Sequence, residues 1–107
     1  MKRPPKKVRV MDIEANGLLE TVNKLHCFVF STLDKQTVNK FRPDEIDKAL
    51  EFLASCDVII GHNIISYDFP AIKKVTGYDF PGQKVDTLIM SRMLNPKRID
   101  RKSKRLN

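Results

Sequence analysis

Two carboxylates near the start of the chain have a spacing that could serve chemistry. The alternation from Lys7 to Glu14 predicts a β-strand, so Asp12 and Glu14 leave the same face, about 6–7 Å apart at Cα. They follow Val8 and Val10 on that face, and carboxylates in an apolar row are costly to desolvate unless a cation compensates. A divalent metal does this through hard oxygen ligands. The alternative is that both lie beyond the buried part of the strand and are simply solvated.

A second group of polar residues follows a short apolar segment, residues 58–61. His62 and Asn63 come directly after it, and Tyr67 and Asp68 open the next predicted helix. Ligands of open α/β sheets bind at the carboxyl ends of strands, and a helix dipole favours a carboxylate in the first turn. The alternative is an ordinary first-turn acid, a loop asparagine and a tyrosine that covers the core.

The hydrophobic periodicity predicts the elements that position these residues. Strands are expected in 7–14, 25–33, 37–41 and 58–60, and helices from 44 to about 54, from near Tyr67 to Gly77, and from 87 to 94. A turn is expected at 34–36 and a loop around Pro81 and Gly82. The predicted order is strand, strand, strand, helix, strand, helix, helix. The fold class is therefore α/β or α+β with a mixed sheet.

The composition fits one small domain, because 107 residues with 41% hydrophobic content can bury one core. No apolar run approaches the roughly 20 residues of a membrane span, and no signal peptide is evident, so we expect a soluble, cytoplasmic protein without a membrane partner. Cys27 and Cys56 lie in apolar segments without metal-ligand spacing, which predicts buried free thiols.

The net charge of +7 is concentrated at the two ends of the chain. Residues 1–10 hold five basic groups, and residues 97–107 hold six against one acid, while the middle is mildly acidic. Basic ends suit nucleic-acid phosphates, although such blocks can also be solvated tails. We expect a basic tail at 1–6, a domain at 7–96 and a second basic tail at 97–107.

The two polar segments together resemble a known family. Residues 12–19 (DIEANGLL) resemble the first motif of the DEDD 3′→5′ exonucleases, and residues 62–68 (HNIISYD) resemble the second. Residues 24–27 and 85–92 also match segments of that family. The resemblance, over about residues 8–96, is to the N-terminal proofreading exonuclease domain of phage family A DNA polymerases.

The resemblance implies an RNase H-like fold in which three antiparallel strands are followed by a fourth in parallel. It implies that Asp12, Glu14 and Asp68 are catalytic and bind two divalent ions, Mg²⁺ or Mn²⁺. The substrate would be the 3′ end of single-stranded DNA. The residues that would contact its terminal nucleotide are Leu18, His62, Asn63 and Tyr67.

The family's third motif supplies a fourth carboxylate and has the form Tyr-x-x-x-Asp or His-x-x-x-x-Asp. The sequence departs from the family pattern after Asp68, because neither form is present there. Asp86 coincides with a family position that supports the structure, and Asp79 and Asp100 fall in a loop and a tail. We therefore expect that this chain is truncated before the third motif.

Three hypotheses remain open. The chain could be a nuclease half-site that a second chain completes, an inactive module that binds nucleic acid or protein, or a minimal nuclease with an unrecognised carboxylate. The first also predicts an exposed apolar patch that includes Met90, Met93 and Leu94, where missing helices would pack.

Overall fold

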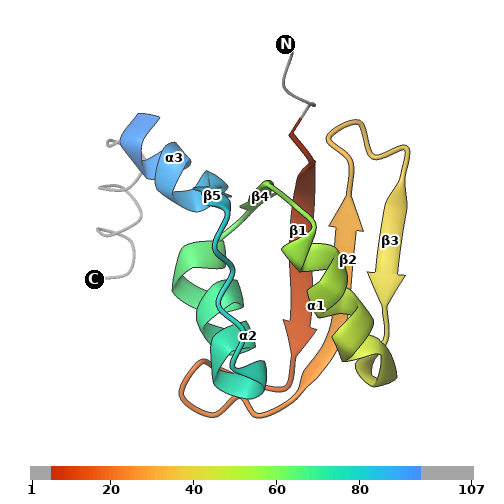
Figure 1. Ribbon diagram of the computed structural model, residues 1–107. Helices are drawn as coiled ribbons and strands as arrows, with labels where there is room; N and C mark the ends of the chain where they lie inside the picture. Colours follow the sequence, from red (N-terminus) through yellow and green to blue (C-terminus); the bar gives the residue numbers. More distant parts are fainter. Residues whose placement is uncertain (1–5, 95–107) are drawn as a thin grey trace, which may run out of the picture.

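The computed structural model describes residues 6–94, which form one mixed β-sheet with helices packed on it (Figure 1). The strands are β1 (Val8–Ala15), β2 (Leu25–Ser31), β3 (Val38–Phe41), β4 (Val58–Gly61) and β5 (Gln83–Asp86). The helices are α1 (Ile46–Ala54), α2 (Phe69–Thr76) and α3 (Thr87–Leu94). A 3-10 turn, η1 (Pro43–Glu45), precedes α1, and a π-helical turn, η2 (Ile64–Asp68), precedes α2.

The strand order across the sheet is β3-β2-β1-β4-β5. β1, β2 and β3 pair antiparallel, whereas β4 pairs parallel with both β1 and β5. The predicted mixed sheet is confirmed, with an antiparallel opening and a fourth strand added in parallel. This arrangement is compatible with an RNase H-like fold.

Two elements differ from the sequence prediction. Residues 83–86 lie between the loop expected around Pro81 and Gly82 and the helix expected from 87, and no strand was expected there. They form β5, whose strand conformation depends on pairing with β4, including Ile60 with Val85. A four-residue segment containing Gln83 and Lys84 is too short and polar to show a strand pattern. The second helix was expected to begin near Tyr67, but it begins at Phe69, after η2.

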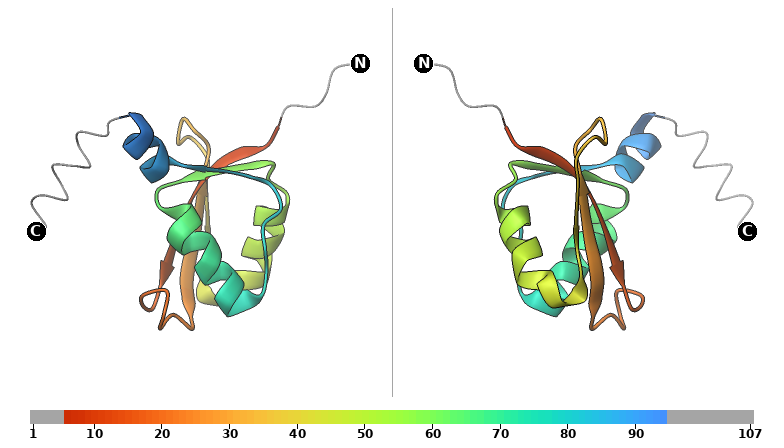
Figure 2. Two further views of the ribbon diagram at one scale, coloured as in Figure 1. Left: turned by 90° about the vertical axis from the view of Figure 1, so that its left-hand side faces the viewer. Right: turned by 90° about the vertical axis from the view of Figure 1, so that its right-hand side faces the viewer.

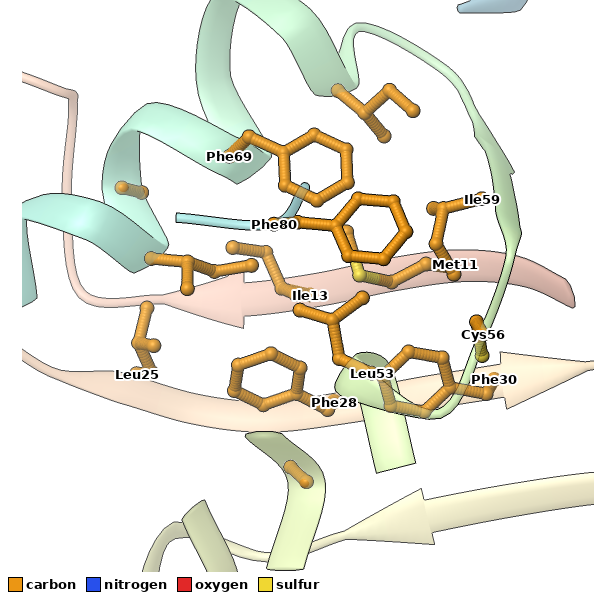
Figure 3. Packing of buried hydrophobic residues seen from close by; sticks show 14 of the residues in the cluster. Met11, Ile13, Leu25, Phe28, Phe30, Leu53, Cys56, Ile59, Phe69 and Phe80 are labelled. Atoms are coloured by element: carbon orange, nitrogen blue, oxygen red, sulfur yellow. The ribbon is translucent and has the colours of Figure 1, made fainter. Parts of the chain in front are cut away.

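The core lies between the sheet and helices α1 and α2, which pack on the same face of it (Figure 2). Met11 and Ile13 of β1 point into this core beside Phe28 and Phe30 of β2, and Leu53 of α1 packs against them (Figure 3). The alternation along β1 therefore sends its even-numbered residues to the other face. Within residues 6–94, no helix packs across that second face as α1 and α2 do on the first; we call it the open face.

The helix boundaries agree with the local signals in the sequence. Before α1, the Glu45 carboxylate accepts a hydrogen bond from the backbone N–H of Arg42 at 3.1 Å, next to Pro43. α2 ends at Gly77, whose positive φ of 82° is a conformation that glycine adopts without strain.

The side chains of α3 confirm the expected apolar exposure. Met90 is 46% exposed, Met93 75% and Leu94 81%. Cys56 is buried and Cys27 half-buried, and both are free thiols. Across residues 6–94, no helix has the length and apolar character needed to cross a bilayer. The predicted tail at 97–107 lies outside the described residues, and so does the predicted tail at 1–6 except for Lys6.

Candidate functional site

Strand β1 presents Asp12 and Glu14 on the open face, where both are exposed. Their cross-strand neighbours on β2 are Val29, opposite Asp12, and Cys27, opposite Glu14. The strand register shifts directly after Glu14, as is common beside active sites. Because both carboxylates are exposed, the expectation that an apolar row would desolvate them is not met.

Asp68 is in a different environment, because its side chain is only 6% exposed. Burial, followed by the negative charge of Asp12, raises the pKa of Asp68 to about 7, although the backbone amides of Ile13 and Asp68 oppose the rise. Its Oδ2 atom is buried and has no hydrogen-bond partner among the described residues. Asp68 is therefore not the ordinary first-turn acid of the alternative interpretation, since buried carboxylate oxygens are almost always paired.

The π-helical turn η2 carries Asp68 to this position. Such turns are rare and occur frequently at functional sites. η2 begins three residues after Gly61. A Cβ added to Gly61 would lie 2.4 Å from Cγ2 of Ile64 and 2.8 Å from the backbone oxygen of Met11. A glycine at this position therefore allows η2 to approach β1, the strand that carries Asp12.

The carboxylate of Asp86 binds the backbone at the start of η2. It accepts hydrogen bonds from the backbone N–H groups of Asn63 (3.0 Å), Ile65 (3.0 Å) and Leu88 (2.9 Å). Burial works to raise the pKa of Asp86, but these amides and that of Ile89 together lower it. The structure thus gives Asp86 a supporting role, as its position in the sequence indicates, rather than that of a spare metal ligand.

The four residues predicted to contact a nucleotide lie in two places. The Tyr67 hydroxyl donates a hydrogen bond to the backbone oxygen of Gly17, which places Tyr67 beside the loop that carries Leu18. Leu18 is 72% exposed. His62 and Asn63 lie at the end of β4, near the start of α3, where Nδ1 of His62 is 3.1 Å from Oγ1 of Thr87. η2 connects the two places along the chain.

The described part of the chain does not assemble a complete metal site. Among residues 6–94, no group of three or more His, Cys, Asp and Glu side chains is arranged to hold an ion. Asp12 and Asp68 are close enough for the charge of one to shift the pKa of the other. Glu14 lies two residues further along the same face. The structure therefore shows two carboxylates that interact electrostatically, Asp12 and Asp68, and the second has a buried oxygen without a hydrogen-bond partner within residues 6–94.

Comparison with known proteins relates the chain to DNA polymerases. It is 34% identical over 97 residues to the DNA-directed DNA polymerase of Escherichia phage T7, covering 80% of this chain, and 33% identical over 97 residues to that of Enterobacteria phage T3. This chain is homologous to part of a phage DNA polymerase. It spans 14% of the length of each of these polymerases.

The fold has a counterpart among solved structures. The family B DNA polymerase from the hyperthermophilic archaeon Pyrobaculum calidifontis superposes with a TM-score of 0.59 and 19% identity, covering 79% of this chain and 16% of that polymerase. At this identity the similarity shows a shared fold alone. No protein-family model matches the sequence.

Proposed function

We propose that this chain provides part of the active site of a 3′→5′ exonuclease, of the proofreading type associated with DNA polymerases, acting on the 3′ end of single-stranded DNA. The observation that carries the proposal is the buried, unpartnered carboxylate oxygen of Asp68 beside the carboxylate of Asp12. Homology to phage DNA polymerases supports a function on DNA.

The donor set fits a divalent cation, Mg²⁺ or Mn²⁺. The charges of Asp12 and Asp68 repel each other, and burial further disfavours the charge on Asp68, so a cation held by these two residues would offset both costs. Glu14, exposed on the same face, would supply a further oxygen. In phosphodiester hydrolysis, paired divalent ions stabilise the attacking and the leaving oxygen.

The remaining ligand would come from a second chain that covers the open face. Residues 6–94 contain no complete ligand set, and α3 exposes Ile89, Met90, Met93 and Leu94. Contiguous exposed apolar side chains commonly mark an interface. We propose a cytoplasmic location on the similarity to phage DNA polymerases alone.

Leu18, His62, Asn63 and Tyr67 would contact the terminal nucleotide. The exposed side chain of Leu18 and the half-buried ring of Tyr67 offer apolar surface to a base. His62 and Asn63 offer polar groups at the carboxyl end of β4, where ligands of such sheets bind.

Metal binding by the isolated chain is the first test. Calorimetric titration with Mn²⁺ at neutral pH should give binding to the wild-type protein that Asp68→Asn weakens about tenfold or more, since it removes one charged ligand of the pair. Asp79→Asn, at an exposed acid in the loop before β5, is the matched control and should not change the affinity. Equal Mn²⁺ affinity in all three proteins would contradict the proposed site.

Nuclease activity is the second test. Co-expression with the product of the neighbouring reading frame should yield Mn²⁺- or Mg²⁺-dependent removal of 3′ nucleotides that Asp12→Ala abolishes. No gain of activity over the isolated chain would count against the half-site.

A binding module without catalysis is the second candidate, because the described residues lack a full set of ligands. It predicts salt-dependent binding to DNA that survives the double change Asp12→Ala, Glu14→Ala, with no metal-dependent cleavage.

A further inference from the structure

The loop between β1 and β2 is held by a lysine of helix α2. Nζ of Lys74 donates hydrogen bonds to the backbone oxygens of Leu19 and Glu20, both at 2.8 Å. These residues are more than fifty positions away from Lys74 in the sequence, so the two contacts fix the loop to the helix that follows Asp68. Hydrogen bonds with a charged donor are shorter and stronger than neutral ones.

The contacts of Lys74 lie directly next to Leu18. The residue before it, Gly17, has its backbone oxygen bound by the Tyr67 hydroxyl, and the residue after it, Leu19, has its backbone oxygen bound by Lys74. The backbone oxygen of Leu18 itself accepts hydrogen bonds from the N–H groups of Thr21 (3.0 Å) and Val22 (2.7 Å). Three successive peptide groups are therefore held in place.

The base of the same loop is closed independently. Oδ1 of Asn16 accepts hydrogen bonds from the backbone N–H groups of Asn23 (3.1 Å) and Lys24 (3.2 Å), and Val22 is almost fully buried. The side chain of Leu18 nevertheless remains 72% exposed. The backbone around Leu18 is thus rigidly positioned, while its side chain is left free to contact another molecule.

We infer that Lys74 is a positioning residue for nucleotide binding, which holds the loop so that Leu18 meets the base at the 3′ end of the DNA. The inference rests on the proposed function and assigns Lys74 no contact with the nucleotide. Its ammonium group has three donors, and two of them are used on the loop. A loop ordered before binding loses less conformational entropy when the ligand arrives, which raises affinity.

The chain offers a matched control in the preceding residue. Lys73 has the same charge, lies on the same helix and is also exposed, but its Nζ contacts Asp79 at 3.5 Å rather than the loop. Lys73→Met and Lys74→Met therefore remove the same charge from nearly the same position. Only the second removes the contacts beside Leu18.

The test measures binding of two DNA probes by fluorescence anisotropy in the presence of Mn²⁺. Both are short 5′-fluorescein-labelled oligodeoxythymidylates with a phosphorothioate at the last linkage, and one ends in thymidine whereas the other ends in an abasic sugar. Lys74→Met and Leu18→Ala should each raise the Kd for the thymidine-ended probe about fivefold to tenfold, because contact with one base is weakened. For the abasic-ended probe, Lys74→Met should change the Kd no more than Lys73→Met does.

Two further variants separate positioning from charge and stability. The double variant Lys74→Met, Leu18→Ala should bind the thymidine-ended probe about as weakly as either single variant, since both changes remove the same contact. Lys74→Arg, which keeps the charge and the donors, should restore at least part of the affinity.

Different failures overturn different statements. If the wild-type chain binds neither probe, the proposed function fails and this inference fails with it. If the wild-type chain binds, but Lys74→Met weakens both probes equally or its effect adds fully to that of Leu18→Ala, the role of Lys74 is wrong and the proposed function stands.

Discussion

Replacement of Asp68 by asparagine should stabilise the protein above neutral pH. The pKa of Asp68 is about 7 in the folded protein, against 3.8 for an aspartate side chain that is free in water. The folded state therefore binds this proton more tightly than the unfolded state, so the stabilising contribution is complete below about pH 4 and is lost as the pH rises through 7. A rise of the pKa of Asp68 from 3.8 to about 7 corresponds to about 4 kcal/mol in the free energy of unfolding.

The Asp68→Asn side chain is neutral at every pH, so its free energy of unfolding should vary less between about pH 4 and pH 8. At pH 8 the variant should be more stable than the wild type by up to about 4 kcal/mol, less the cost of burying an amide. Urea unfolding followed by circular dichroism, at several pH values, measures both quantities. Asp79→Asn, at an exposed acid, should leave the pH profile unchanged.

The proposed metal site predicts a second difference between the wild type and the Asp68→Asn variant. Mn²⁺ at about a hundred times its Kd should raise the wild-type free energy of unfolding by about 2.7 kcal/mol at pH 8, because the ion binds only the folded state. The Asp68→Asn variant should gain much less. The reasoning is refuted if that variant is no more stable than the wild type at pH 8, or if its pH profile runs parallel to that of the wild type.

Other substitutions test the supports of the site. Asp86→Ala should lower the free energy of unfolding by about 2–4 kcal/mol in urea titration, because three half-buried backbone N–H groups lose their acceptor. Asp79→Ala, at an exposed acid, should change it by less than about 0.5 kcal/mol. Gly61→Ala should lower the free energy of unfolding by about 2 kcal/mol or more in the same urea titration, since its Cβ would lie 2.4 Å from Cγ2 of Ile64. A urea unfolding curve identical to that of the wild type would contradict this. Met93→Lys, at a side chain 75% exposed, should reduce binding of a hydrophobic dye while leaving the midpoint of unfolding unchanged.

Much of the fold could be predicted because each element has a local signal. The alternation in β1, the apolar spacing in α1 and the stop at Gly77 depend on neighbouring residues only, and all three are confirmed. β5 could not be predicted, since four residues with two long polar side chains become a strand only by pairing with β4. The π-helical turn before Phe69 was missed for the same reason, because Asp86, more than twenty residues away, holds its first amides.

The sequence singled out the residues of the candidate site but not their environments. Asp12, Glu14 and Asp68 were singled out from their spacing and their place at strand ends, but the reason given for the first two, desolvation beside Val8 and Val10, does not hold, since both are exposed. Asp68 is the carboxylate that is desolvated, because it is buried. Burial of one carboxylate depends on the whole surrounding packing, which the spacing of residues in a sequence does not contain.

The sequence by itself determined which residues carry charge and which face of β1 they share, because side-chain direction along a strand follows from backbone geometry alone. Only the tertiary structure decided which carboxylate is buried. It also decided that Lys74 binds the loop that carries Leu18. Both outcomes depend on segments distant in the chain that pack together. A pKa and a long-range hydrogen bond are set by neighbours in space, which local sequence patterns do not specify.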